Sequence, residues 1–161
     1  MTELARIDVD AGSFVVRRAT AEDVGAIVEL IAADQLGRER DGGELAPYLA
    51  AFEHIDLDPA QLLVVLTDSA HEVVGTLQLT TIPGLARRGA LRAQIEAVRV
   101  AERLRGQGVG GAMLEWAVAE AARRGCALVQ LTSDKRRADA HRLYGRLGFV
   151  DSHEGFKLRL A

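Results

Sequence analysis

Cysteine is almost absent from this chain of 161 residues, in which Cys126 is the single example. One thiol forms neither an internal disulfide nor a cysteine-rich zinc site. This favours a reducing compartment and predicts a cytoplasmic protein. Long apolar runs are missing too, since the longest aliphatic run, Leu62 to Leu66, is far below the roughly 20 residues that cross a membrane. The first ten residues are acidic and lack an apolar core, so we expect no secretory signal there.

Aromatic residues are scarce as well, at 4% of the chain. Charge is unevenly divided: residues 1–80 hold 5 Lys/Arg against 15 Asp/Glu, whereas residues 81–161 hold 15 against 8. A nucleic-acid binder usually combines a basic stripe with stacking aromatics, so we expect no nucleic-acid partner. The basic half fits a small polyanionic ligand better, although chance distribution over a solvated surface explains the same numbers.

The order of strand and helix patterns predicts one α/β (α+β) domain that spans residues 1–161. A meander lies in the middle of the chain, and strands alternate with helices later, which indicates a mixed sheet with helices on both faces. The predicted strands are 13–18, 61–67, 73–81, 91–100, 127–132, 149–150 and 156–160. The predicted helices are 20–36, 45–54, 109–124 and a helix within 134–147.

The sharpest motif is a glycine-rich turn between a predicted strand and a predicted helix, with the sequence Arg105-Gly106-Gln107-Gly108-Val109-Gly110-Gly111. Glycine lets a backbone approach a ligand closely. The first amides of the helix are unpaired and carry partial positive charge, and Arg103 and Arg105 add full charges beside them. This combination is typical of a phosphate cradle, and an ordinary turn without a ligand is the alternative.

Three kinds of phosphate site can be compared with this turn. A P-loop requires Lys and Ser/Thr after its last glycine, but Gly111 is followed by Ala112. A dinucleotide fingerprint requires G-x-G-x-x-G and an acidic residue at the end of the next strand, and neither is present. The third pattern, R/Q-x-x-G-x-G/A, is matched by Arg105, Gly108 and Gly110.

The third pattern resembles the acetyl-CoA-binding motif of the GNAT N-acetyltransferases. Residues Ile95 to Val100 resemble the strand that precedes this motif, and Ala140 to Phe149 resemble the family's late A-x-x-L/F-Y-x-x-L-G-F segment. Two motifs in the family's order make the resemblance specific. It implies a GNAT-type mixed, mainly antiparallel twisted sheet with helices on both faces and a splayed central strand pair.

The resemblance also implies an enzyme that transfers an acetyl group from acetyl-CoA to a primary amine by direct attack. Main-chain groups near Val98 and Val100 would bind the pantetheine arm, and the amides from Arg105 to Gly110 would wrap the pyrophosphate. The cofactor-binding residues that it implies are Val98, Val100, Arg103, Arg105, Gly106, Gln107, Gly108, Val109, Gly110, Gly111 and Arg137. At Arg137 the sequence departs from the family, which commonly has Asn there.

Glu96 is the first of two candidate catalytic residues. An amine attacks only after it loses a proton, and a carboxylate can remove that proton through water. Strand alternation predicts that Glu96 shares one face with Val98 and Val100, beside the acyl arm. The alternative is a salt bridge to Arg92 or an exposed edge.

Tyr144 is the second candidate, because it occupies the position where the family commonly places its general acid. Its phenol would protonate the leaving thiolate of CoA. The alternative is a tyrosine packed as core beside Leu147 and Phe149.

A weaker resemblance concerns the identity of the acceptor. The run Arg136 to Tyr144, followed by Ser152-His153, resembles a subgroup that acetylates small amines such as aminoalkylphosphonates, which implies a small-molecule amine acceptor. Whether His141 or His153 contacts the acceptor is left open. We expect no bound metal. The family resemblance implies a possible homodimer. The acidic half could instead line an entrance for cationic amines. The alternative functions are a non-catalytic acetyl-CoA sensor or interaction module and a protein N-acetyltransferase.

Overall fold

A computed structural model describes residues 3–33 and 41–160 of the chain. Its six strands form one sheet in the order β1-β2-β3-β4-β5-β6, so the sheet follows the order of the chain. Neighbouring strands are antiparallel except β5 and β6, which run parallel. The strands are β1 (Glu3–Val9), β2 (Gly12–Arg18), β3 (Gln61–Thr67), β4 (Val73–Ile82), β5 (Arg92–Val100) and β6 (Leu128–Leu131).

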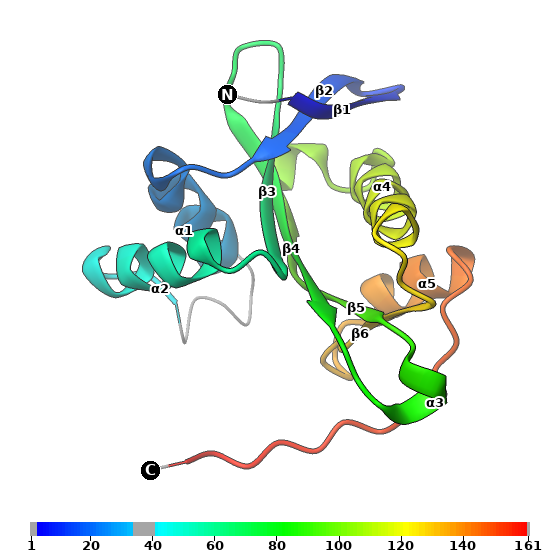
Figure 1. Cartoon of the computed structure of the whole chain (residues 1–161). Coiled ribbons are helices and arrows are strands. Elements are labelled where there is room, and N and C mark those ends of the chain that lie inside the picture. Colours follow the sequence, from blue (N-terminus) through cyan, green and yellow to red (C-terminus); the bar gives the residue numbers. More distant parts are fainter. Residues whose placement is uncertain (1–2, 34–40, 161) are drawn as a thin grey trace.

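Helices cover both faces of this sheet (Figure 1). The α-helices are α1 (Val24–Ala32), α2 (Ala46–Leu57), α3 (Ala86–Gly89), α4 (Val109–Arg123) and α5 (Ala138–Arg146), and two short 3₁₀ helices are η1 (Ala21–Asp23) and η2 (Glu102–Leu104). Helices α1 and α2 pack on one face, where Phe52 meets Leu63 and Val65 of β3. Helix α4 packs on the other face, where Met113 and Leu114 join the larger core cluster.

The sequence pattern explains the central elements directly. Strand β3 is apolar along its whole length because both of its faces are covered, and every residue from Leu62 to Thr67 is buried. Helix α4 buries Val109, Met113, Ala117 and Ala121 at a spacing of four residues, which is one stripe of an α-helix. Gly125 ends this segment with a φ of 80°, a conformation that glycine adopts without strain.

A buried ion pair fixes the entry into the first helices. The guanidinium of Arg17 donates to both carboxylate oxygens of Asp23 at 2.7 Å, and the two side chains are only 11% and 7% exposed. Asp23 also accepts from the Thr20 amide at 2.7 Å, as expected of a residue three positions after a helix cap. Burial opposes ionisation of Asp23, but the bonds from Arg17 and Thr20 prevail and lower its pKa.

The predicted fold class is confirmed, with three differences in detail. Strand β1 was not predicted. The first helix ends at Ala32, with Ala33 as its C-cap, and the remainder of the predicted helix, 34–36, lies outside the described residues. The predicted strands 149–150 and 156–160 are wrong, because these residues pair with no strand in the described part of the chain. Phe149 is partly buried, whereas Val150 and residues 156–160 are exposed. The splayed pair, β5 and β6, therefore lies at one end of the sheet.

Candidate active site

The site begins where β5 and β6 part. Their parallel pairing runs from Arg92 opposite Leu128 to Ile95 opposite Leu131, and stops there. From Glu96 to Val100, β5 has a strand neighbour on its β4 side alone among the described residues. Main-chain groups of this open segment that point away from β4 are available to a ligand, which can bind to them as an added strand does.

A β-bulge at Ala97 lies inside the open segment. Ala97 has a φ of 52°, which is uncommon for any residue other than glycine. Between the pairs Gln78–Glu96 and Thr76–Arg99, the register advances by two residues in β4 and by three in β5. An extra residue of this kind reverses the alternation of side chains along a strand.

The bulge corrects the predicted arrangement of β5. Ile95 packs in the core cluster beside α4, and so do Val98 and Val100, although odd and even positions should face opposite sides. Glu96 lies opposite Gln78, and Gln78 faces α1 and α2. The prediction that Glu96 shares a face with Val98 and Val100 is therefore wrong. Glu96 is exposed and belongs to the α1–α2 face.

A small apolar pocket lies on that same face, between α1, α2 and the sheet. Its volume is about 110 Å³. Ala97, the bulge residue, lines it together with Thr76 and Gln78 of β4. The other lining residues are Val24, Ile27, Val28, Ile31, Tyr48, Ala51, Phe52, Ile55 and Leu63. The sequence pattern predicted a helix over the α1 residues but gave no signal that they line a pocket beside the bulge.

The glycine-rich turn lies at the carboxyl end of β5, before α4. Gly106 and Gly108 have φ values of 75° and 83°, and a Cβ at either position would meet no atom within 4 Å. Within the described chain, the amides from Gly106 to Gly111 donate no hydrogen bond outside helix α4. These amides can therefore receive an anion at the positive end of α4. The Arg105 amide cannot, because it donates to the Glu102 carbonyl at 3.1 Å.

The arginines beside this turn have different surroundings. Arg103 donates to the carboxylate of Asp68, in the turn between β3 and β4, at 2.7 Å, and this bond lowers the pKa of Asp68. The Arg105 Nε donates to the Val100 carbonyl at 3.3 Å, which holds its exposed side chain along the carboxyl end of β5. Arg105 is therefore better placed than Arg103 to face an anion on the turn.

Tyr144 lies on α5, where it is partly buried against the core beside α4. Its ring meets that of Phe149 edge to face, with the centroids 6.0 Å apart. Burial raises the pKa of Tyr144, while the positive charges of Arg137 and Arg99 oppose that shift. A phenol with a raised pKa is protonated at neutral pH, so Tyr144 can give a proton. Arg137, at the start of α5, and Arg99, in the open segment of β5, lie within electrostatic range of this phenol.

Other candidates lie apart from this arrangement. The His141 ring contacts the Asp134 carbonyl at 3.0 Å, and His153 contacts Ser152 on the exposed C-terminal segment at 2.8 Å. Burial raises the pKa of the Cys126 thiol, as expected of a small apolar residue rather than a nucleophile. Among residues 3–33 and 41–160, no group of three His, Cys, Asp or Glu side chains could hold a metal ion.

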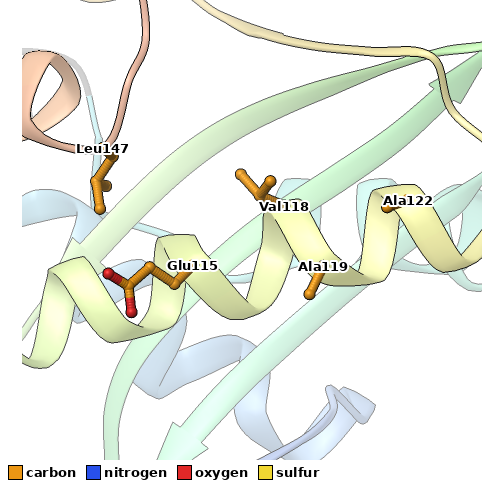
Figure 2. Close-up of a pocket in the computed structure, with 5 residues that line it drawn as sticks. All are labelled: Glu115, Val118, Ala119, Ala122 and Leu147. Atoms are coloured by element: carbon orange, nitrogen blue, oxygen red, sulfur yellow. The ribbon is translucent and has the colours of Figure 1, made fainter.

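A larger hollow of about 250 Å³ lies on the outer side of α4 (Figure 2). It is lined by Glu115, Val118, Ala119, Ala122 and Leu147, none of which belongs to β5 or to the glycine-rich turn. It therefore has no part in the chemistry of the open strand. No helix in the described part of the chain is long and apolar enough to span a bilayer.

Comparison with known proteins agrees with this geometry. Residues 12–149 match the model of the acetyltransferase (GNAT) family. The chain is 33% identical over 141 residues to an aminoalkylphosphonate N-acetyltransferase of Salmonella typhimurium, with 87% of each chain covered. It is also 43% identical to a Bacillus halodurans protein described as a transcriptional regulator, with a TM-score of 0.87 and coverage of 91% of this chain and 99% of that one.

A third relative was solved with the donor. This Clostridium acetobutylicum protein, described as a predicted acetyltransferase with acetyl-CoA, is 18% identical and has a TM-score of 0.71, and the match covers 91% of this chain and 96% of that one. At 18% identity, this similarity shows a shared fold alone. The matches to the family model and to the Salmonella enzyme show that the chain belongs to the GNAT acetyltransferase family. It is an N-acetyltransferase family enzyme, and the family's acetyl donor is acetyl-CoA.

Proposed function

We propose that the chain acetylates the primary amine of a small molecule whose carbon skeleton is apolar. The observation that carries this proposal is the pocket of about 110 Å³ behind Ala97, which adjoins the open segment of β5 and has no charged side chain among its described lining residues. An apolar pocket of this size suits a short alkyl or aryl group. A phosphonate would need a cation or several donors in the same place.

The residues present also fit the donor. The free amides from Gly106 to Gly111 can hold the pyrophosphate, with Arg105 beside them. Main-chain groups of Val98 and Val100 can bind the pantetheine arm, since β6 has parted from β5 at that point. Acetyl-CoA supplies the activated acetyl group when it is bound. The turn and the open strand act by holding it in one orientation, which is a large part of the catalysis of acyl transfer.

Glu96 then accepts a proton, and Tyr144 donates one. Glu96 extends from the face that carries the pocket, so its carboxylate can take a proton from the acceptor ammonium through water. The amine nitrogen forms a bond to the acetyl carbon as the carbon–sulfur bond breaks. Tyr144 approaches from the α5 side, and its protonated phenol can give a proton to the sulfur that leaves. The nitrogen loses its second proton to water as the amide forms, and water returns a proton to the phenol. The amine proton thus leaves on one side of the strand, and the thiol proton arrives on the other.

A turnover screen with acetyl-CoA tests the acceptor class. It compares short alkylamines and arylalkylamines with aminoalkylphosphonates, amino acids, polyamines and peptides by release of free CoA thiol. We expect the highest kcat/KM for uncharged apolar amines. A preference of about tenfold or more for the phosphonates, equivalent to about 1.4 kcal/mol, would overturn the apolar class. A preference for peptides would overturn the small-molecule class.

Glu96→Gln tests the proton acceptor. We expect kcat to fall by roughly a hundredfold or more and its pH profile to change, with the Kd for acetyl-CoA nearly unchanged. Glu115→Gln is the matched control, because Glu115 lies on the outer side of α4 and should leave all three quantities alone. Unchanged activity across pH in Glu96→Gln would show that this carboxylate is not the base.

The name of the Bacillus relative favours one alternative, in which the chain binds acetyl-CoA in order to control a partner. Such a module needs the glycine-rich turn but neither Glu96 nor Tyr144. Tight binding of acetyl-CoA, with no CoA release for any amine in the screen, would favour it over catalysis.

A further inference from the structure

The pocket between α1, α2 and the sheet contains an accepting oxygen that no donor of the described residues reaches. Three of its lining residues carry polar side chains: Tyr48, Thr76 and Gln78. The Tyr48 hydroxyl accepts from the Gly42 amide at 2.8 Å, and the Thr76 hydroxyl donates to the Val64 carbonyl at 2.8 Å. Gln78 differs from both, because its side-chain nitrogen is bonded while its side-chain oxygen is not.

A short chain of hydrogen bonds determines which way the Gln78 amide faces. The Gln61 nitrogen faces the carboxylate of Asp58, 3.5 Å from its Oδ2. A carboxylate only accepts hydrogen bonds, so the Gln61 oxygen faces the other way, toward β4. There it accepts from the Thr80 hydroxyl at 2.7 Å and from the Gln78 nitrogen at 2.8 Å. With its nitrogen held by Gln61, Gln78 keeps its oxygen as the open end of this chain.

This oxygen is accessible and lies close to the proposed base. Gln78 is partly buried, but its oxygen is not among the fully buried side-chain atoms of the described chain that lack a partner. Gln78 on β4 lies directly opposite Glu96 on β5, and side chains paired in this way have Cβ atoms about 4.5–5.5 Å apart. Ala97, the next residue, lines the same pocket as Gln78. An amide oxygen and a carboxylate thus occupy facing positions beside the pocket.

Two accepting groups at facing positions suit a ligand that is rich in N–H bonds. A primary ammonium has three such bonds, and a carboxylate alone attracts it without fixing the direction of the nitrogen. A hydrogen bond to an amide oxygen that is itself held in place fixes that direction. The bond survives deprotonation, because a primary amine still has N–H bonds when its lone pair becomes available for attack.

We propose that the side-chain oxygen of Gln78 binds an N–H of the acceptor amine, and that Gln61 is a positioning residue that keeps this oxygen directed away from β3. The assignment rests on the proposed function, because it requires an amine acceptor on the α1–α2 face. Gln78 holds the nitrogen while Glu96 takes up its proton through water, so the two residues have separate tasks. The apolar walls of the pocket then select the carbon skeleton, and Gln78 selects the amine.

Binding without chemistry tests this assignment. Phenethylamine is titrated by calorimetry into the full chain saturated with CoA, which has no acetyl group to transfer. Gln78→Met removes the accepting oxygen and keeps the length of the side chain, so we expect the Kd for the amine to rise roughly tenfold. Gln94→Met is the matched control. Gln94 accepts from Gln130 at 2.7 Å and does not line the pocket, so the Kd should change by less than about twofold.

A double-mutant cycle tests the positioning role of Gln61. Gln61→Met should raise the Kd for phenethylamine by less than Gln78→Met does, because the oxygen is still present but is no longer held. Added to Gln78→Met, it should raise the Kd no further, since no oxygen remains to be positioned. A merely structural role would make the two effects add. The Kd for CoA should be the same in all of these variants.

The outcomes separate this assignment from the proposed function. If Gln78→Met binds phenethylamine as tightly as the native chain, Gln78 does not hold the amine, and the acetyl-transfer proposal stands. Equal losses in Gln94→Met and Gln78→Met would also overturn the assignment, because the cause would then be a general change in the sheet. If the native chain with CoA binds neither phenethylamine nor butylamine, the proposed acceptor class and the role of Gln78 are both overturned.

Discussion

The two sides of the open strand β5 differ in whether backbone groups or side chains form the site. On the α4 side, the site consists of backbone: free amides of the turn, two left-handed glycines and the segment of β5 that has no pairing with β6. On the α1–α2 side, it consists of side chains that enclose a pocket beside Ala97. This difference explains why the α4 side, which we propose holds the donor, has a recognisable motif: its backbone geometry requires glycine at fixed positions. The α1–α2 side, which we propose holds the acceptor, requires only a pocket of suitable shape, and many sequences can produce one.

Tyr144→Phe probes the α4 side of the strand, and it should have the largest effect of the three variants compared below. The ring packing on Phe149 is retained, but the proton donor is lost. We expect kcat to fall by roughly a hundredfold, while the Kd for acetyl-CoA and the melting temperature change little. Stopped-flow measurement of CoA release would isolate the chemical step. Full activity would assign Tyr144 to packing.

Gly108→Val should damage the donor side selectively. Gly108 has a φ of 83°, where a residue other than glycine costs about 1–2 kcal/mol, so we expect acetyl-CoA to bind roughly five- to thirtyfold more weakly by calorimetry. Gly125→Val is the matched control. Gly125 has a φ of 80° at the other end of α4, so it carries a similar strain away from the turn. Equal losses of affinity in both variants would mean that strain in the helix, and not the turn, sets affinity.

Ala51→Phe should damage the acceptor side selectively and less severely. Ala51 lines the pocket from an exposed position on α2, so a larger side chain can fill the pocket without unfolding the helix. We expect KM for the acceptor to rise roughly tenfold, with KM for acetyl-CoA unchanged. Ala50→Phe, one position earlier and outside the pocket, should change neither. If KM rises equally for both substrates, the pocket does not belong to the acceptor.

The same difference decides what the sequence could predict. Strand β3 and the start of α4 match their predicted bounds because their apolar patterns are continuous or strictly periodic. The glycine-rich turn was found because few residues other than glycine tolerate its backbone. The bulge at Ala97 was missed, since alanine carries no signal for a positive φ, and the face of Glu96 was therefore assigned wrongly.

The ends of the chain were also hard to predict. Strand β1 lies at one end of the sheet, where four of its seven residues are exposed, and it lacks a clear apolar pattern. The C-terminal segment has a strand pattern but pairs with no strand in the part of the chain that the structure describes. A pattern shows that a segment can be a strand, whereas its neighbour in the sheet decides whether it is one.

The ion pair between Arg17 and Asp23 gives the two sides of the site different sensitivity to acid. The pKa of Asp23 is lower in the folded chain than its ordinary value of 3.8. The pair therefore stabilises the fold fully above that value, and this stabilisation is lost as the pH falls through the lower, folded pKa. Asp23 precedes α1, whose residues Val24, Ile27, Val28 and Ile31 form one wall of the pocket. Acid should thus loosen the α1 wall of the proposed acceptor pocket, whereas the groups of the glycine-rich turn that we propose bind the anion are backbone amides, which do not titrate.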